Sequence, residues 1–371
     1  MSDRTSGSKV ARWAGVLGIA ALVFAACSGG ATSAPATAAP ATVAPATAAA
    51  TEAPTAAPTP KSDNPYFDTG AIAGSGAGLK VGYISLGDAI PFVKLVTDSI
   101  AEQAKIAGLT FSPCDSQVDA AKSLECGQNL GVQGVQGVLN FNLFGDSSKA
   151  ICAAYGGVPT IAIDIHQPPC ETTFFGANNK KAGEIGGAGL GDVLKVQDGC
   201  KYDEVITLES AAAGVVNTDR VQGMLDGLAS VCGPIDPAKI NHLEVGGTTE
   251  LALAKFNDLL PTLKPGGIYV LLSLNDDMGL GALAAAKQAN REGELRIGAQ
   301  GADPSSWKEM ACDTKIWLAD SAYFPELYGK TLVPAIIDIL NGKTVAKELY
   351  TPHIAINKDN IRQIYPATPA C

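Results

Sequence analysis

The sequence predicts an α/β protein made of two doubly wound, parallel-sheet lobes. From residue 79 onward, short β-rich segments alternate with amphipathic helical patterns, and the alternation restarts near residue 205. Alternation of this kind specifies a parallel sheet with helices on both faces. About 300 residues follow a low-complexity N-terminal stretch, which is enough for two separate hydrophobic cores.

The predicted elements follow from these patterns, with β-branched and aromatic runs read as strands and 3.6-residue periodicity as helices. In the first half we predict strands at 80–85, 109–114, 137–141 and 160–163, with helices at 91–107, 118–130 and 147–155. In the second half we predict strands at 205–209, 240–245, 268–273, 295–298, 316–319 and 353–356, with helices at 217–232, 251–263 and 278–291.

Residues 1–27 predict an export signal. Basic residues precede the apolar run 13–26, which ends at Cys27. The run is shorter than the roughly 20 apolar residues of a membrane-spanning helix and is typical of a secretory signal. Segment 23–27 (VFAAC) resembles a bacterial lipobox, which implies a diacylglyceryl group on Cys27. Ordinary cleavage among the alanines is the alternative.

A tether is predicted over residues 28–62, which are nearly all Ala, Thr and Pro. Such a segment lacks the large apolar side chains that offset chain entropy, so we expect it to be disordered and extended. Pro-rich linkers act as semi-rigid spacers. We expect this one to hold the domain away from a membrane, with no binding role of its own.

The remaining cysteines predict disulfides in an oxidising compartment. They are even in number, and none has the Cys-x-x-Cys spacing of a zinc ribbon or redox motif. Disulfides persist outside the cytosol, in agreement with the export signal. Spacing alone leaves the connectivity open. The eight residues are Cys114, Cys126, Cys152, Cys170, Cys200, Cys232, Cys312 and Cys371.

Composition and motifs argue against nucleic-acid binding and catalysis. The formal charge of −10 is opposite to the basic surface that a nucleic-acid partner needs. The three histidines are far apart, and the chain has no HExxH, G-x-S-x-G or Walker-type motif. The glycine-rich stretch 183–191 does not fit a dinucleotide fingerprint, and we attribute it to close helix packing. We therefore predict no metal, no cofactor and no enzymatic activity.

Polar and aromatic residues gather at the predicted strand ends, where ligands of doubly wound sheets bind. Amides and carboxylates satisfy sugar hydroxyls, and aromatic rings cover the apolar face of a sugar. Each residue has an alternative role as a helix cap, turn former or core residue. As a set, they favour a ligand site. The set comprises Asp88, Phe92, Asn140, Phe141, Asn142, Asp164, Asn178, Asn179, Asn217, Thr218, Asn275, Asp276, Asp277, Gln300, Tyr323 and Phe324.

From about Lys80 to the C-terminus the chain resembles the type I periplasmic binding proteins of the ribose/galactose class, which are related to the effector domains of LacI-type repressors. No helix-turn-helix precedes the fold, so the repressor branch is excluded. Segment 275–285 (NDDMGLGALAA) is the most specific of the matching pieces. The others are VGYISLGDAIPFV (81–93), DSQVDAAK (115–122), IAID (161–164), ANN (177–179), GAQG (298–301) and AYFPELYG (322–329).

The resemblance implies a set of ligand contacts. They fall on Phe92, Asp164, Thr218, Asn275, Gln300 and Tyr323, to which we add the strand-end residues Phe141 and Asn178. The sequence departs from the family pattern at four places. Ile165 and Thr218 replace arginines, Gln300 replaces an aspartate, and Gly247 replaces an aromatic residue. Loss of charged partners removes strong, charge-assisted hydrogen bonds.

The resemblance also implies the domain organisation. The first lobe comprises residues 78–177 with 324–352, and the second comprises 178–323 with 353–371. Three crossover strands near 177, 323 and 352 form the hinge. In this fold, cysteines that are neighbours in the sequence lie close together. The predicted pairs are Cys114 with Cys126, Cys152 with Cys170, Cys200 with Cys232, and Cys312 with Cys371.

The expected function is that of a monomeric solute-binding lipoprotein anchored to the outer face of the cytoplasmic membrane. Its ligand is expected to be a small polar molecule, a sugar in the first place. Lobe closure would deliver the ligand to an ABC permease and its ATPase. The alternative is a sensor lipoprotein that binds a ligand for a chemoreceptor or signalling kinase.

Overall fold

The computed structural model describes residues 62–371. The predicted export signal, Cys27 and the tether up to residue 61 lie outside the described residues. Residues 62–77, upstream of the predicted first lobe, pack onto that lobe. Asn64 Nδ2 donates to Thr331 Oγ1 at 2.9 Å, and Tyr66 donates from its hydroxyl to Asp338 Oδ2 at 3.1 Å. Residues 62–77 therefore belong to the packed structure of the first lobe.

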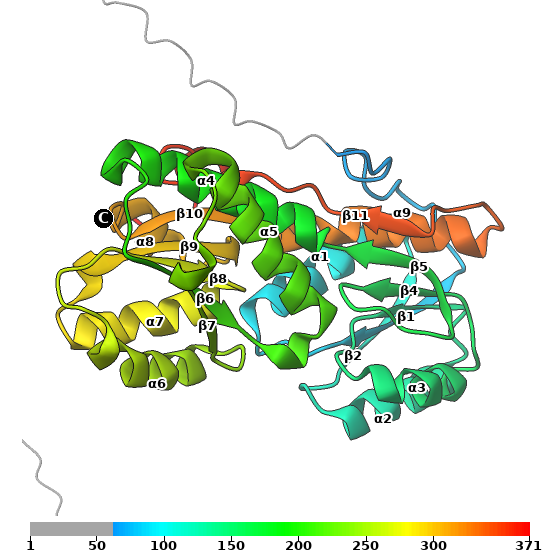
Figure 1. The fold of residues 1–371 in the computed structure, drawn as a ribbon. Helices are drawn as coiled ribbons and strands as arrows, with labels where there is room; N and C mark the ends of the chain where they lie inside the picture. Colours follow the sequence, from blue (N-terminus) through cyan, green and yellow to red (C-terminus); the bar gives the residue numbers. More distant parts are fainter. Residues whose placement is uncertain (1–61) are drawn as a thin grey trace, which may run out of the picture. The chain divides into compact units, whose positions relative to one another are not determined.

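The first sheet has six parallel strands in the order β11-β5-β4-β3-β1-β2 (Figure 1). Helices α1 and α9 bury their apolar residues against one face, and α2 and α3 cover the other. The strands are β1 (Lys80–Ser85), β2 (Thr110–Asp115), β3 (Gly137–Asn140), β4 (Thr160–Ile163), β5 (Glu171–Gly176) and β11 (Glu348–Tyr350). The helices are α1 (Pro91–Ala107), α2 (Ala120–Gln133), α3 (Ser148–Ala154) and α9 (Tyr328–Leu340).

The second sheet has the order β12-β10-β9-β8-β6-β7, and only the edge strand β12 runs antiparallel to its neighbour. Helices α4 and α5 cover one face, and α6 and α7 cover the other. The strands are β6 (Glu204–Glu209), β7 (Ile240–Glu244), β8 (Tyr269–Ser273), β9 (Leu295–Gly301), β10 (Trp317–Ala322) and β12 (Ala355–Ile356). The helices are α4 (Asn179–Asp198), α5 (Val215–Cys232), α6 (Thr249–Leu259), α7 (Asp276–Gln288), α8 (Trp307–Cys312) and α10 (Ile361–Ile364).

The chain passes between the two sheets three times: from β5 to α4, from β10 to α9, and from β11 to β12. The third segment is hydrogen-bonded to both of the others. Thr351 donates from its backbone nitrogen to Gly176 O at 2.9 Å, and from its hydroxyl to Tyr323 O at 2.8 Å. The predicted α/β class with two doubly wound, parallel sheets is confirmed.

Six elements have no counterpart in the prediction: β5, α4, α8, α9, β11 and α10. The glycine-rich stretch 183–191 lies within α4, and it packs closely against α5 as expected. A Cβ on Gly187 would lie 2.1 Å from Met224 O, and one on Gly227 would lie 2.2 Å from Glu184 O. The two helix backbones approach this closely only because both helices carry glycine at the contact.

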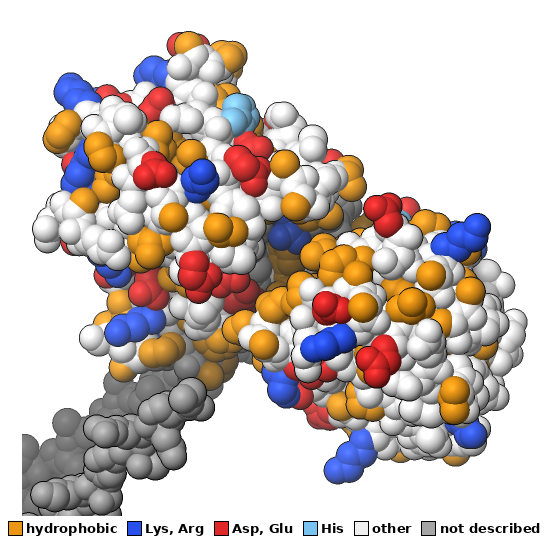
Figure 2. Space-filling model, turned by 90° about the horizontal axis from the view of Figure 1, so that it is seen from below, with side chains coloured by type: hydrophobic (Ala, Val, Ile, Leu, Met, Phe, Trp, Pro, Cys, Tyr) orange, Lys and Arg blue, Asp and Glu red, His pale blue; other side chains and the backbone are white. Residues whose placement is uncertain are grey.

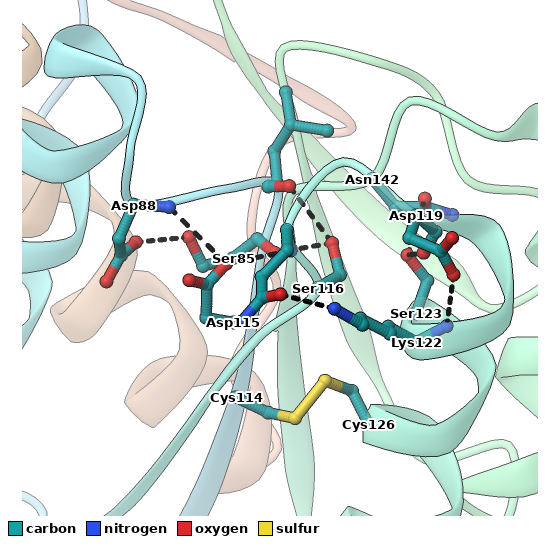
Figure 3. The surroundings of a disulfide bond; sticks show 12 residues. Ser85, Asp88, Cys114, Asp115, Ser116, Asp119, Lys122, Ser123, Cys126 and Asn142 are labelled. Atoms are coloured by element: carbon teal, nitrogen blue, oxygen red, sulfur yellow. Dashed lines mark hydrogen bonds between the residues drawn. A yellow bond between two sulfur atoms is a disulfide. The ribbon is translucent and has the colours of Figure 1, made fainter. Parts of the chain in front are cut away.

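Four disulfides connect the predicted pairs of neighbouring cysteines, with Cα–Cα distances of 5.4–5.8 Å. Cys114–Cys126 joins the end of β2 to α2, as Figure 3 shows. Beside it, Ser116 Oγ donates to Ser85 O at 2.8 Å, and Asp119 caps α2 by accepting from Lys122 N. Within residues 62–371, the helices are too short or too polar to cross a bilayer.

Candidate ligand-binding site

Asp164 follows β4 in a left-handed backbone conformation, with φ of 57°. Its Oδ1 accepts hydrogen bonds from Ala177 N at 3.2 Å and from the Tyr328 hydroxyl at 3.1 Å. Burial raises the pKa of Asp164 to about 6, although the charge of Arg220 and both hydrogen bonds act in the opposite direction. The side chain is therefore a carboxyl group that is partly protonated near neutral pH.

Tyr323 follows β10 and is almost fully buried. Its hydroxyl donates to Gln300 Oε1 at 3.0 Å, and its ring meets Phe92 edge to face at 6.5 Å. Phe92 also meets the ring of Tyr328, the residue that donates to Asp164. Four predicted site residues, Phe92, Asp164, Gln300 and Tyr323, thus belong to one connected group.

Arg220, which is not among the predicted ligand contacts, joins this group. Its guanidinium carbon lies 4.8 Å from the centre of the Tyr323 ring. Its Nε donates to Asn179 Oδ1 at 2.8 Å, and its Nη1 donates to Leu274 O at 3.2 Å. The resemblance pointed to position 218, two residues earlier on α5. The sequence does contain a signal for Arg220, because it is the only Lys or Arg between 202 and 238.

The other four predicted contacts lie in different surroundings. Phe141 is buried in the core of the first lobe, and Thr218 is exposed on the first turn of α5. Asn178 caps α4 by accepting from Lys181 N at 3.1 Å. Asn275 caps α7 by accepting from Met278 N at 2.9 Å, and its Nδ2 donates to Gly247 O at 3.1 Å. Their roles as ligand contacts stay predictions.

His353 connects the three crossover segments next to this group. Its Nδ1 lies 3.1 Å from Ala322 O, and its Nε2 accepts from Asn178 N at 3.1 Å. A neutral imidazole ring with its proton on Nδ1 can donate to Ala322 O and accept from Asn178 N at the same time. Burial lowers the pKa of His353 to about 4, and the charge of Arg220 acts in the same direction.

Three carboxyl groups lie at the same edge of the second sheet: Asp276 and Asp320, which are buried, and Asp303, which is half-buried. Within residues 62–371, Asp276 Oδ1 and Asp320 Oδ2 are buried without a hydrogen-bond partner, and the two carboxyl groups act on each other's pKa. Burial raises the pKa of each of the three groups. The negative charges of neighbouring carboxylates raise the pKa values of Asp303 and Asp320 further. Residues 62–371 contain no cluster of three or more potential ligands suited to a metal ion.

The surface charges are mixed in sign. Figure 2 shows acidic and basic side chains dispersed among hydrophobic ones on one face, without a basic stripe there. This distribution agrees with the net charge of −10.

Comparisons with known proteins all indicate the same protein family. Residues 81–344 match the family model described as periplasmic binding protein domain. The ribose import binding protein of Bacillus subtilis is 28% identical over 273 residues, covering 71% of this chain and 82% of that protein. Its counterpart from Haemophilus influenzae is 27% identical over 267 residues, covering 70% and 85%.

Solved structures share the fold. An ABC transporter solute-binding protein from Mycobacterium smegmatis with bound glycerol gives a TM-score of 0.67 at 20% identity, covering 80% of this chain and 98% of that one. A periplasmic ribose ABC transporter protein from Conexibacter woesei gives 0.66 at 18% identity, covering 80% and 97%. The family consists of extracytoplasmic substrate-binding proteins and not of enzymes. This chain belongs to the type I periplasmic binding protein family.

Proposed function

We propose that this protein captures a sugar outside the cytoplasm and delivers it to an ABC importer. The observation that carries the proposal is the connected group of Phe92, Asp164, Arg220, Gln300 and Tyr323. It combines hydrogen-bond donors, an acceptor and aromatic rings at the carboxyl ends of both sheets. Such a combination suits a small polyhydroxylated ligand. The names of the relatives, which are ribose-binding proteins, support the same class.

Lobe closure is the proposed mechanism. Asp164 belongs to the first lobe, whereas Arg220 and Gln300 belong to the second. A ligand that touches both lobes binds more tightly to the closed state, and this differential affinity is what drives closure. The closed protein, acting as a monomer, then presents a surface from both lobes to the permease.

The test of the ligand class is a thermal-shift screen with D-ribose, L-arabinose, D-allose, myo-inositol and glycerol. A ligand at 100 times its dissociation constant adds about 2.7 kcal/mol to the free energy of unfolding, which a melting curve detects. We expect at least one of the sugars to raise the melting temperature. Amino acids and nucleosides serve as comparison ligands. A shift with those, and none with any sugar or polyol, would refute the proposed ligand class.

Sugar uptake by a strain that lacks the gene for this protein distinguishes the importer from the sensor alternative. Loss of uptake of the identified radiolabelled sugar, restored by the wild-type gene, supports transport. Normal uptake with a lost chemotactic or transcriptional response supports a sensor.

We also propose that the protein is lipid-anchored through Cys27. The four disulfides agree with an oxidising compartment. The Cys27→Ala variant is expected to leave the membrane fraction and appear in the soluble extracytoplasmic fraction. If the variant stays with the membrane, the apolar run 13–26 anchors the protein as a span instead.

A further inference from the structure

The order of the strands determines which loops lie at the open side of the junction between the lobes. The crossovers leave from the carboxyl ends of β5, β11 and β10, so the carboxyl ends of both sheets face this junction. All three strands lie at or next to the β11 and β12 edges, whereas β2 and β7 form the opposite edges. Loops that follow β2 and β7 are therefore the farthest from the crossovers.

Exposed hydrophobic side chains gather in the loops on this open side, two from each lobe. The first rim, as we call it, comprises Val118 after β2 and Leu143 after β3, which are 44% and 45% exposed. The second rim comprises Val215 after β6 and Leu251 after β7, which are 69% and 48% exposed. Figure 2 shows a groove between the lobes with hydrophobic side chains on both of its walls. Apolar surface of this kind is typical of a contact surface.

Val118 is held at the first rim by a strained backbone. Its φ of 57° lies in the left-handed region, which β-branched residues rarely adopt. The Val118 nitrogen donates to Leu86 O at 2.7 Å, and Gln117 N donates to Asp115 Oδ1 at 2.9 Å. Ser116 ties the same turn to the end of β1 (Figure 3). Strained residues that their surroundings fix in this way are concentrated at functional positions.

We propose that the two rims pack against each other when the lobes close and form an apolar latch, which stabilises the closed state without touching the ligand. This proposal rests on the lobe closure of the proposed function, but it does not depend on which ligand is bound. Val118 and Leu251 each follow the outermost strand of their sheet, so rotation about the crossovers brings these two residues toward each other. Burial of apolar area on both rims then favours the closed state in proportion to the area removed from water.

Cross-linking of paired cysteines, without any sugar, tests the contact. The full-length variant Val118→Cys/Leu251→Cys is treated with a short bismaleimide, which leaves disulfides intact, and peptide mapping identifies the linked residues. The control is Val118→Cys/Val196→Cys, because Val196 is exposed near the end of α4 that lies away from the crossovers. We expect the rim pair to be linked at least about 10-fold faster than the control pair. Equal rates would overturn the proposal.

A polar residue at position 118 tests whether the contact is an apolar latch. Asn tolerates the left-handed conformation, so Val118→Asn should not lower the melting temperature of the ligand-free protein. Added to the reporter variant Leu143→Cys/Val215→Cys, it should slow cross-linking about 3- to 10-fold, because the closed state is populated less. Val132→Asn, at an exposed valine of α2, should leave the reporter rate unchanged. If Val118→Asn also leaves it unchanged, the strained residue serves only its own turn and the proposal fails.

Rim contact and sugar binding are measured separately. If the rim pair is linked quickly and Val118→Asn slows the reporter, but no sugar stabilises the protein, the latch stands and the proposed ligand class fails. If a sugar stabilises the wild type, but the rim pair is linked no faster than the control pair, the proposed function stands and the latch fails.

Discussion

Asp164 couples ligand binding to pH, since burial raises its pKa to about 6. The ionised carboxylate is the better acceptor for a sugar hydroxyl, and the ionised fraction falls to about a tenth at pH 5. Neither neighbour cancels the effect, because Arg220 stays charged and the Tyr328 pKa is raised well above its ordinary value. We expect sugar affinity to fall roughly 10-fold from pH 8 to pH 5. In titrations of Asp164→Asn, this dependence should disappear; a dependence that persists would assign it to another group.

Asn275 uses both ends of its side chain within the protein. Removing an N-cap costs about 1 kcal/mol, and the bond to Gly247 adds to the loss. We expect Asn275→Ala to lower the free energy of unfolding by about 1–2 kcal/mol in urea melts without ligand. Asn275→Asp, which keeps the capping oxygen, should retain most of the wild-type free energy of unfolding. An unchanged melt combined with weaker sugar binding would show instead that Asn275 acts mainly on the ligand.

Asp276 and Asp320 form a buried pair of carboxyl groups that act on each other's pKa. Because its carboxyl pKa values are raised in the folded state, the stability it provides is present in acid and lost as pH rises through those values. Asp320→Asn keeps an acceptor for Ala302 N and provides a donor for Asp276. We expect this variant to be more stable than wild type at pH 8, with the difference shrinking toward pH 4. A destabilisation that is the same at both pH values would contradict this account.

Half of the predicted contacts form one group, because aromatic and polar side chains at buried strand ends meet one another there. Gln300 and Tyr323 are examples: both are buried, and they satisfy each other. Asn275 and Asn178 show the limit of the approach, because a strand-end Asn is also the preferred helix cap. Arg220 was missed because its contact with Tyr323 joins segments about a hundred residues apart. The local signal, a single basic residue between 202 and 238, does not identify the partner.

At the scale of elements, the contact between α4 and α5 depends on glycine. A Cβ on Gly187 would lie 2.1 Å from Met224 O, so Gly187→Ala must push the two helices apart. Gly to Ala in an exposed helix stabilises by up to about 1 kcal/mol, whereas overpacking costs about 1–3 kcal/mol. We therefore expect a net loss of stability in thermal or urea melts. Val196→Ala, on the exposed side of α4, is the control. A stabilised Gly187→Ala variant would mean that the helices separate without cost.

Elements with a strong local signal were predictable, and those defined by distant partners were not. Helix α1 has the predicted bounds because its apolar residues repeat at helical spacing and Gly108 ends it in a left-handed conformation. Helix α4 has a weak apolar pattern because six of its eight buried residues are glycine or alanine. Strand β11 is three residues long and forms only by pairing with β5.

At the scale of the whole molecule, the order of the strands explains the cysteine pairs. In a doubly wound sheet each strand is followed by a helix that packs beside it, so a cysteine at a strand end and one on the next helix become neighbours. Cys114 and Cys126 have this relation to β2 and α2. Cys312 and Cys371 instead connect α8 to the C-terminus, a contact that follows from the overall topology of the fold.

His353 connects the segments that join the two lobes, so its protonation acts on the whole molecule. The ring accepts from Asn178 N through Nε2, and only the neutral form can do so. With a folded pKa of about 4 against an ordinary value near 6.5, the stability it provides is complete above pH 6.5 and is lost as pH falls toward 4. The loss amounts to at most about 3 kcal/mol.

Asp164 acts in the opposite direction over nearly the same range, because its raised pKa removes stability as pH rises from about 4 to about 6. A plot of wild-type stability against pH therefore does not reveal either effect by itself, and a variant is needed to separate them.

We expect His353→Phe, which keeps a ring but leaves Asn178 N and Ala322 O unpaired, to be less stable than wild type by about 2–3 kcal/mol at pH 7 in urea melts. The difference should shrink steadily down to pH 4, where the wild-type imidazole is itself half protonated. A penalty for His353→Phe that stays constant from pH 7 to pH 4 would mean that the ring's packing, and not its nitrogen atoms, holds the three segments together.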